Sequence, residues 1–446
     1  MWKVIYDYFL MGEMTWFVVL WLSIAFIMLS RMVLAGFYFL KEYREAPLRR
    51  MRVMCEDNDY RVTTIVTCAK EDPFAFKRAM KKLKHQRGLT KHAILVLIDA
   101  ADDLTANDRQ CIAIAKQHAD IVLLGNHRDK RVNLGALVKM AADNGILYDL
   151  LTPMDSDTIC DHDWVMAELC DAFKDLEVGG ATTSQRCLWV RNAIERDGDW
   201  LEHARILNSM AAGSLFGQVL CLLGRLYMVR TALVVPQIYE ISKEEWSGLK
   251  FSLSFLFIKK WRVKCKAGDD RWITNLILKQ GYKTVMVASA GVKTIVPNTY
   301  RVLWKTWRRW GTTVSGYFYR TLSWLWRRPF AFYHALSDIY ITHVSVFLVL
   351  SWIYNIFFGQ EETLFPLSIM MVLSLAGLMA TFILRQLPHL FKHPADFLLL
   401  PHFIVVVTIG QFVRLWAHYT PWMVGTWGTR SGIDDDVGEV WIKRVR

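Results

Sequence analysis

Two kinds of apolar pattern divide this sequence. Between residues 60 and 290, short apolar runs alternate with polar stretches of helical spacing. At 14–40, 338–358, 365–384 and 397–413 the apolar residues instead continue for about the length that crosses a bilayer. The pattern therefore predicts a water-soluble domain set between membrane segments.

The short apolar runs of the central region predict buried strands, because each is bounded by polar residues and is rich in Val, Ile and Leu. The expected strands are 61–69, 92–100, 119–125 and 148–158. The polar stretches 72–86 and 104–119 between them predict crossover helices. Strand followed by helix, repeated, predicts a doubly wound α/β domain, in which ligands bind at the carboxyl ends of the strands. Asp99, Asp155 and Asp157 fall at such ends.

The first apolar segment predicts a retained membrane span. Residues 14–30 carry no charge, and the basic stretch 41–52 follows the apolar residues without a small-residue cleavage site. The basic flank predicts that the C-terminal end of this span lies in the cytosol.

The C-terminal apolar segments predict a membrane hairpin and a third segment. The acidic sequence "GQEET" separates 338–358 from 365–384, and we expect this loop to face outward. Residues 301–337 mix Trp, Tyr, Phe and Arg, which is typical of amphipathic helices in the membrane interface. If the C-terminus is cytosolic, 397–413 must be re-entrant or interfacial.

These patterns predict five parts. They are an N-terminal span with its basic flank (1–52), a cytosolic domain (53–297), interface helices (298–337), a membrane or re-entrant channel region (338–418) and a C-terminal segment (419–446).

The formal net charge of +12 would suit nucleic acid, an anionic membrane surface or an acidic substrate. Much of the basic charge flanks the apolar segments, so we expect a lipid bilayer as partner and a multi-pass protein of the cytoplasmic membrane. We expect no nucleic-acid partner, because the basic residues do not line an aromatic groove. The eight cysteines lie between the first and the later apolar segments without a CxxC pair, which is typical of free thiols in a reducing cytosolic domain.

The sequence "MDSDT", Met154–Thr158, is the first candidate site. Asp155 and Asp157 offer the oxygen ligands that Mg²⁺ and Mn²⁺ prefer, and phosphate oxygens and water would complete the shell. A solvated turn is the alternative. The apolar run that precedes the pair favours the metal site, because an exposed turn does not need such a run.

The sequence "AGDDRWITN", 267–275, is the second acidic site. Asp270 is the candidate general base that takes a proton from an acceptor hydroxyl, with Asp269 and Arg271 beside it in the catalytic set. The alternative is that Asp269 or Asp270 caps a helix that begins near Trp272.

The sequence "TWRRW", 306–310, puts positive charge and indole rings beside the membrane. Arg309 could stabilise a departing diphosphate, and Trp310 could pack on a nucleotide or acceptor sugar. An interfacial aromatic and arginine belt is the alternative. Trp307 is a candidate for the acceptor site or for this belt, and Trp304, Trp324 and Trp326 are expected in the belt.

Four further residues have both a functional and an ordinary interpretation. Lys130 and Arg131 precede a helix, where they could meet nucleotide phosphates or form a solvated charge run. Asp99 could accept a hydrogen bond from the base or ribose of a nucleotide, or cap a helix. Cys221 is an acceptor-site candidate, although a buried structural thiol is the ordinary outcome in its apolar run.

In this order the motifs resemble those of the processive, membrane-embedded family 2 glycosyltransferases, and among these the hyaluronan synthases. The motifs that carry the resemblance are Asp99, "DKR", "DSDT", "CLLGRL", "GDDRWITN", "TWRRW", "KHPADFLLLP" and "WGTR". They extend over nearly the whole chain.

The resemblance implies a GT-A-type cytosolic α/β domain combined with transmembrane and interfacial helices. It implies Asp155 and Asp157 as metal and nucleotide ligands, Asp270 as base, and a pore through which a polysaccharide leaves. It also implies that "WGTR" folds back to the catalytic site, so Trp427, Thr429 and Arg430 become candidates for nucleotide contacts.

Three departures concern the sugar rather than the reaction. The tyrosine-asparagine-glutamate expected after the first strand is replaced by "TCAKEDP", Thr306 stands where a glutamine is expected, and "LGRLYMVR" replaces a glycine-proline-leucine segment. The last form is closer to that expected of alginate-type polymerases.

The sequence thus predicts an enzyme that polymerises UDP-sugars with a growing polysaccharide as acceptor, most simply UDP-GlcNAc and UDP-GlcA in a hyaluronan-like chain. An alginate, chitin or other capsule polymer is the alternative within this class. A membrane scaffold without catalysis is the alternative outside it. The pattern leaves the oligomeric state open.

Overall fold

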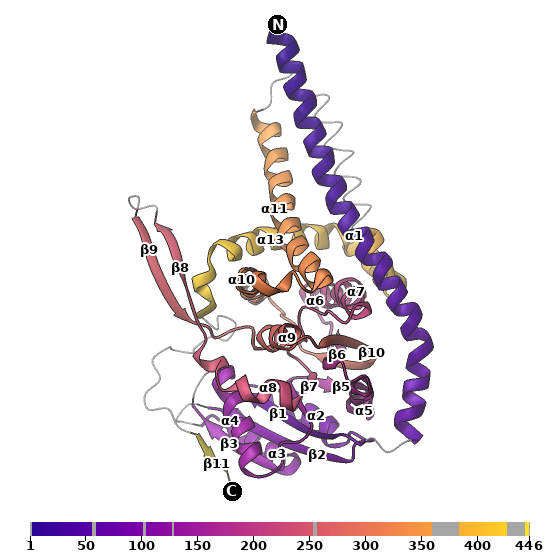
Figure 1. The fold of residues 1–446 in the computed structure, drawn as a ribbon, viewed down its shortest axis with the longest axis vertical. Coiled ribbons are helices and arrows are strands. Elements are labelled where there is room, and N and C mark those ends of the chain that lie inside the picture. The colour runs from indigo at the N-terminus through magenta and orange to yellow at the C-terminus, as the bar shows by residue number, and fades with distance from the viewer. Residues whose placement is uncertain are drawn as a thin grey trace.

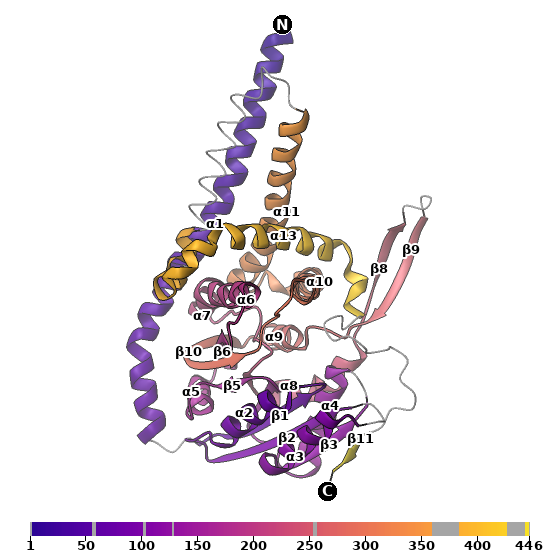
Figure 2. The same cartoon turned by 180° about the vertical axis from the view of Figure 1, so that it is seen from behind.

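The computed structural model describes residues 2–55, 59–100, 104–126, 129–252, 257–358, 383–425 and 442–445. Two long helices, α1 (Trp2–Cys55) and α11 (Pro329–Phe358), rise together from an α/β domain (Figure 1). A third, α13 (Leu400–Tyr419), runs across them above the domain in both views (Figures 1 and 2). The arrangement separates a mixed α/β body from the elongated apolar helices.

The α/β domain is built on a mixed sheet, in which nine strands are described in the order β11-β3-β2-β1-β4-β7-β6-β10-β5. The strands are β1 (Arg61–Cys68), β2 (Lys91–Asp99), β3 (Ile121–Gly125), β4 (Leu150–Asp155), β5 (Ile159–Cys160), β6 (Val178–Cys187), β7 (Tyr227–Arg230), β10 (Lys283–Thr294) and β11 (Ile442–Arg444). β1 to β4 are the four strands that the apolar runs predict, and they are parallel neighbours. β7 pairs antiparallel with β4 and β6, so the sheet becomes mixed beyond β4.

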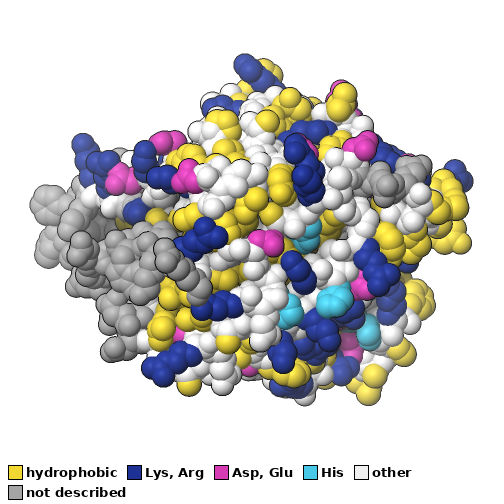
Figure 3. Space-filling model, turned by 90° about the horizontal axis from the view of Figure 1, so that it is seen from below, with side chains coloured by type: hydrophobic (Ala, Val, Ile, Leu, Met, Phe, Trp, Pro, Cys, Tyr) yellow, Lys and Arg dark blue, Asp and Glu magenta, His cyan; other side chains and the backbone are white. Residues whose placement is uncertain are grey.

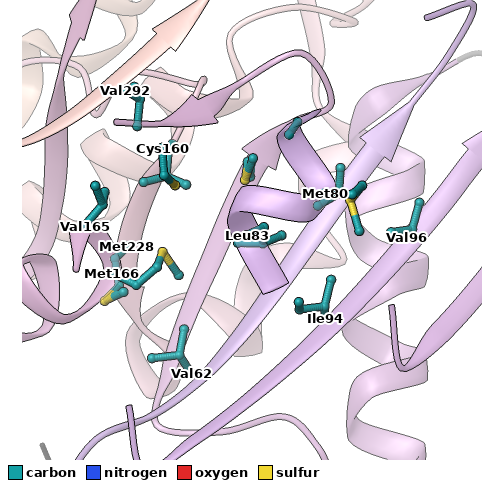
Figure 4. Packing of buried hydrophobic residues seen from close by; sticks show 14 of the residues in the cluster. Val62, Met80, Leu83, Ile94, Val96, Cys160, Val165, Met166, Met228 and Val292 are labelled. Atoms are coloured by element: carbon teal, nitrogen blue, oxygen red, sulfur yellow. The ribbon is translucent and has the colours of Figure 1, made fainter. Parts of the chain in front are cut away.

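Helices cover both faces of the sheet. The helices are α2 (Pro73–Lys84), α3 (Ala106–His118), α4 (Lys130–Asp143), α5 (Val165–Asp171), α6 (Ala193–Ala204), α7 (Ala211–Leu215), α8 (Thr231–Ile238) and α9 (Asp269–Lys279), with short helical turns at Ala172–Lys174 and Ile241–Lys243. Apolar side chains of α2, α3 and α5 pack on one face, and those of α4, α8 and α9 pack on the other. Figure 4 shows part of the first core, where Met80 and Leu83 of α2 lie over Ile94 and Val96 of β2. Burial on both faces explains why β1 to β3 read as continuous apolar runs.

Local signals define where the crossover helices begin. Asp72 accepts a hydrogen bond from the N–H of Phe74, and Pro73 occupies the first helical position of α2. Thr105 and Asp108 form a reciprocal capping box at the start of α3. These caps agree with the helices expected at 72–86 and 104–119.

The lower half of α1 binds the α/β domain through ion pairs. Arg50 Nε lies 3.0 Å from Glu168 Oε1, and an Arg52 nitrogen lies 2.6 Å from Asp171 Oδ2, both on α5. Arg49 pairs with Glu42 at 2.6 Å within α1. The basic stretch expected beside the first span therefore continues the helix and attaches it to the domain.

The apolar helices are joined to one another by polar contacts. Arg31 of α1 lies 2.8 Å from Asp338 of α11, and Ser30 lies 2.8 Å from Tyr333. Three described helical stretches are long and apolar enough to cross a membrane: Val18–Cys55, Pro329–Ser351 and Pro394–Tyr419. The last includes a 3-10 turn, Pro394–Leu399, ahead of α13. Most of the span expected at 365–384 lies outside the described residues, and 383–392 are helical.

Helix α10 (Tyr300–Leu325) packs against α13 through glycines. A methyl group added at Gly410 would overlap the indole of Trp307, and one added at Gly311 would lie 2.8 Å from Cβ of Ala417. The two helices can approach closely because these positions have no side chain.

Three further elements complete the described structure and, like β5, β6, β7 and β10, were not among those predicted from the sequence. A hairpin of β8 (Glu245–Ser252) and β9 (Phe257–Lys264) projects from the domain beside the end of α13 (Figure 1). β11 pairs antiparallel with β3, which brings residues 442–444 back to the edge of the main sheet. A short 3-10 turn, Pro421–Gly425, follows α13.

Figure 3 shows the face of the domain that points away from the long helices. Lys and Arg side chains are spread over this face among apolar and acidic ones, together with a group of histidines.

Candidate active site

The DSD motif forms a tight turn at the carboxyl end of β4. The N–H of Asp155 donates to the carbonyl of Arg225 at 2.9 Å, and the N–H of Thr158 donates back to the Asp155 carbonyl at 3.1 Å. The side chain of Asp155 is 36% exposed. Asp157 accepts a hydrogen bond from Thr294 of β10 at 3.3 Å. The turn is therefore part of the strand-end region where α/β domains bind ligands.

Lys130 joins the DSD turn to the GDD segment. Its Nζ lies 2.7 Å from Asp155 Oδ1 and 3.1 Å from Asp269 Oδ2. Asp129 accepts from the N–H of Arg131 and thereby starts α4, which directs Lys130 toward both acids. Because the Lys130 side chain is only 13% exposed, the alternative of a solvated charge run does not describe it.

The pKa values of the two acids of the GDD segment shift in opposite directions. Burial opposes the charge on Asp269, but Lys130 and Arg131 together hold its pKa below the usual value. Burial and the neighbouring Asp269 raise the pKa of Asp270. Burial also opposes the charge on Lys130, yet Asp155 and Asp269 raise its pKa. Two adjacent carboxyl groups with divergent pKa values are typical of an acid and base assignment.

Helix α9 presents both acids from its first turn. Gly268 precedes them with φ of 77°, a conformation that favours glycine, and it packs against Tyr317 and Thr313 of α10. Helix α9 begins at Asp269, ahead of the start near Trp272 considered above. Gly268 occupies the N-cap, so neither acid is the N-cap residue, but Asp270 Oδ1 accepts from the N–H of Arg271 in the first turn at 2.7 Å.

The segment around Cys221 lies beside Asp270. Cys221 Sγ is 3.4 Å from Asp270 Oδ2, and burial raises the pKa of the thiol. A methyl group at Gly224 would lie 3.3 Å from the same oxygen. Thr274 holds the Cys221 segment against α9, because it donates to the Asp270 carbonyl at 2.6 Å and accepts from the N–H of Leu222 at 2.8 Å.

Arg131 and Asp99 lie behind the site. The buried guanidinium of Arg131 donates to Glu244 at 2.7 Å and to the Ala267 carbonyl at 2.6 Å. Its side chain therefore supports the approach to Gly268 from inside the domain. Asp99 is nearly buried and accepts from Asn133 at 2.9 Å. Contacts of either residue with a nucleotide stay predictions.

The TWRRW residues lie on α10, two of them buried and three half-buried. Trp307 is buried between α10 and α13, whereas Arg309 and Trp310 are half-buried. The guanidinium of Arg205 lies 5.5 Å from the ring centre of Trp310. Thr306 donates to the Val302 carbonyl within the helix at 2.9 Å. Trp307 packs in an apolar cluster with Leu303 and Val406, and its contact with an acceptor stays a prediction.

An ion cluster around the buried Glu202 connects Trp310 to the DSD turn, and it was not predicted from the sequence. Glu202 of α6 pairs with Arg225 at 3.1 Å and also with Arg205, which begins the π-helical turn Arg205–Met210. The carbonyl of Arg225 is the acceptor for the N–H of Asp155. The Glu and Arg spaced three apart at the end of α6 are the one sequence signal that could have identified this cluster.

Tyr227 is a second residue that the sequence did not reveal. Its side chain is buried, and its hydroxyl has no hydrogen-bond partner among the described residues. Burial raises its pKa, and Asp269, Asp270 and Asp155 add to this effect.

The donor chemistry of the DSD turn fits a magnesium or manganese ion. Asp155 and Asp157 provide hard oxygen ligands, the type that these cations prefer. Two carboxylates leave further positions for phosphate oxygens and water. Trp427, Thr429 and Arg430 lie outside the described residues, so their position relative to this turn stays a prediction.

The sequence is similar to proteins of known activity. It is 26% identical over 255 residues to an N-acetylglucosaminyltransferase of Rhizobium leguminosarum bv. viciae, covering 56% of this chain and 54% of that protein. It is 27% identical over 291 residues to a hyaluronan synthase of Streptococcus pyogenes serotype M1, covering 64% of this chain and 63% of that protein. The match thus spans about half the length of the rhizobial relative.

A solved structure also aligns with this fold. A mannosyltransferase of Pyrobaculum calidifontis, in complex with GDP-Man and Mn²⁺, overlays with a TM-score of 0.46 and 17% identity, covering 89% of this chain and 98% of that chain.

Residues 60–313 match the sequence profile described as "Glycosyltransferase like family 2", which confirms the predicted resemblance and the predicted fold class. The match includes the DSD turn, the Cys221 segment, the GDD segment and the TWRRW residues. This chain therefore belongs to the family 2 glycosyltransferases.

Proposed function

We propose that the protein is a processive, inverting glycosyltransferase that polymerises UDP-GlcNAc and UDP-GlcA into a hyaluronan-like chain and passes the chain across the cytoplasmic membrane. The observation that carries this proposal is the position of Lys130, which contacts Asp155 of one motif and Asp269 of the next. The similarity to the streptococcal hyaluronan synthase supports the choice of sugars.

Asp155 and Asp157 would hold Mg²⁺ or Mn²⁺ together with the donor's diphosphate. The ion supplies charge neutralisation for the departing UDP. Lys130 adds a positive charge on the same side of the site, and its two carboxylate partners hold it in place. Arg309 and Trp310 are proposed to contact the donor from α10.

Asp270 is proposed as the general base. It takes the proton of the acceptor hydroxyl as that oxygen bonds to C1 of the donor sugar, and the bond from C1 to UDP breaks on the opposite face. The raised pKa of Asp270 makes it a stronger base than an ordinary aspartate. Cys221 lies against Asp270 and is therefore proposed to contact the acceptor end of the polymer.

The membrane helices are proposed to form the exit path. α1 and α11 contact each other through Arg31 and Asp338 and are long enough to cross. The pairing of β11 with β3 supports a C-terminus on the catalytic side, which agrees with α13 lying in the interface. Trp427, Thr429 and Arg430 are proposed to meet the nucleotide from this returning segment.

The proposal is tested with purified protein in nanodiscs and radiolabelled UDP-GlcNAc and UDP-GlcA, each alone and together. We expect high-molecular-weight product only with both donors, and its complete digestion by a hyaluronan-specific lyase. Product that forms from one donor and resists the lyase would contradict the choice of sugars. Absence of both UDP release and product under all donors would instead favour a scaffold without catalysis.

A chitin-type homopolymer is the second candidate. The similarity to the rhizobial N-acetylglucosaminyltransferase favours it. This candidate predicts product from UDP-GlcNAc alone that chitinase digests, so the same assay separates the two candidates.

A further inference from the structure

A cluster of histidines lies outside the candidate active site, where α6 meets the helical segment 383–392. Asp199 of α6, His389 and His393 each direct one ligand atom to a common region, and these atoms lie within 4.8 Å of one another. His203, one turn after Asp199, places its Nδ1 3.0 Å from Nδ1 of His389. Both views place α6 below the yellow segment that precedes α13 (Figures 1 and 2).

A second acid orients His389 for ligand binding. Its Nε2 lies 2.8 Å from Asp396 Oδ2, and both side chains are buried. This contact holds the proton on Nε2 and leaves the lone pair of Nδ1 facing His203. A carboxylate on the far nitrogen of an imidazole is the arrangement that orients histidine ligands around metal ions.

The other three residues differ in how firmly they are held. Asp199 Oδ1 accepts from the N–H of Cys187 at 2.8 Å, which fixes the carboxylate and leaves Oδ2 for a ligand. His203 is buried, and its Nε2 has no hydrogen-bond partner among the described residues. His393 is exposed and gives access from solvent.

We propose that Asp199, His389 and His393, whose ligand atoms lie together, are joined by His203 through its contact with His389 in a zinc site that ties the catalytic domain to the membrane segment. Two imidazole nitrogens on one tetrahedral zinc ion are about 3.3 Å apart, close to the 3.0 Å between the two Nδ1 atoms. Binding of the ion would release the proton between these nitrogens to solvent, so that each would offer a lone pair. Three imidazoles and one carboxylate favour Zn²⁺, whereas the all-oxygen DSD turn favours Mg²⁺ or Mn²⁺.

The proposed zinc site would also restrict the movement of α6 relative to the segment 383–392. Glu202 and Arg205 flank His203, and they belong to the ion cluster that reaches the DSD turn. A zinc ion would therefore fix α6 relative to 383–392 at the point where the domain meets the membrane helices. Arg186 and Lys392 lie close enough to act electrostatically on His203, and their positive charge opposes the binding of any cation, so the ligands themselves must supply the affinity for zinc.

The test uses the full chain in nanodiscs after dialysis against EDTA. Zinc content is measured by mass spectrometry after addition of one equivalent of Zn²⁺ and desalting, and Co²⁺ is added in parallel to record its ligand-field absorption. We expect one zinc per chain and a tetrahedral cobalt spectrum. Neither readout depends on enzyme activity, so failure of the proposed function would leave this result unchanged.

Three variants decide between a built site and adventitious binding. H393Q removes an exposed ligand, D396N removes the orienting acid, and H85Q is the matched control at an exposed histidine of the α2 C-cap. H393Q should abolish the cobalt spectrum, D396N should weaken zinc affinity by about 10-fold to 100-fold, and H85Q should change neither. Equal zinc content in wild type and H393Q, or no zinc in either, would overturn the proposal.

Discussion

The ammonium group of Lys130 lies 2.7 Å from a carboxylate oxygen of Asp155, and the same nitrogen reaches Asp269 at 3.1 Å. Three motifs that are far apart in the sequence meet at this single positive charge. The contact has consequences for both catalysis and stability, because removal of Lys130 leaves two acids facing each other in a largely buried space.

We expect K130M to lower glycosyl transfer by about 100-fold, since it removes a fixed positive charge from the proposed donor site. The same change should lower the free energy of unfolding by about 3 kcal/mol, because it leaves the buried Asp269 and the partly exposed Asp155 without this partner. UDP release and thermal unfolding in nanodiscs measure the two effects. K139M, at an exposed position on the same helix, is the control and should alter neither. Unchanged activity in K130M would remove Lys130 from the donor site.

Metal removal tests the DSD turn separately. Excess EDTA should stop UDP release, and added Mn²⁺ or Mg²⁺ should restore it, because the ion neutralises the leaving diphosphate. D157N should raise the Mn²⁺ concentration needed for half-maximal rate by at least about 10-fold, since an amide is a weaker ligand than a carboxylate. A titration of rate against free Mn²⁺ measures this shift. Full activity in EDTA would show that the turn needs no ion.

The raised pKa of Asp270 predicts how the rate of glycosyl transfer depends on pH. A general base must be ionised, and the pKa of Asp270 is raised above 3.8 by burial and by Asp269. The rate should therefore fall as the pH is lowered through this raised pKa, at a higher pH than for an ordinary aspartate. D270N should lower the rate by about 10²-fold to 10⁴-fold at all pH values and abolish this acid limb. Initial rates of UDP release from pH 4.5 to 8.5 measure both.

Two controls accompany the pH experiment. D143N changes an exposed acid at the end of α4 and should keep the wild-type profile. Binding of labelled UDP to D270N should persist, because Asp270 acts on the acceptor. A D270N enzyme with the wild-type acid limb would assign that limb to another group.

The sequence predicted the parts of the fold that depend on local pattern. The apolar runs of β1 to β4 are continuous because helices cover both faces of the sheet. Asp155 and Asp157 could be recognised as site candidates because they stand at the end of a predicted strand. The short strand β11 had no such signal, because three residues at a sheet edge gain their stability from the neighbouring strand.

The sequence did not predict in which direction the side chains of the site point. Arg131 follows Lys130 directly, yet only Lys130 points to the acids. Arg131 turns inward because Glu244, more than a hundred residues away in sequence, offers it a buried carboxylate at 2.7 Å. The pairing of Glu202 with Arg225 was not predicted for the same reason, because the two residues lie on different segments. Such pairings depend on tertiary structure, which no local pattern records.

The contact between Trp307 and Gly410 makes the last prediction. A methyl group at Gly410 would overlap the buried indole, so G410A must push α13 away from α10. We expect it to lower the free energy of unfolding by about 1–3 kcal/mol. Because the membrane helices are proposed to form the exit path, we also expect it to reduce product length. G36A in α1 is the control, because a methyl group there meets nothing within 4 Å; it should be neutral or slightly stabilising. Thermal unfolding and gel sizing of the product measure the effects. Wild-type stability in G410A would contradict the close packing of α13 on α10.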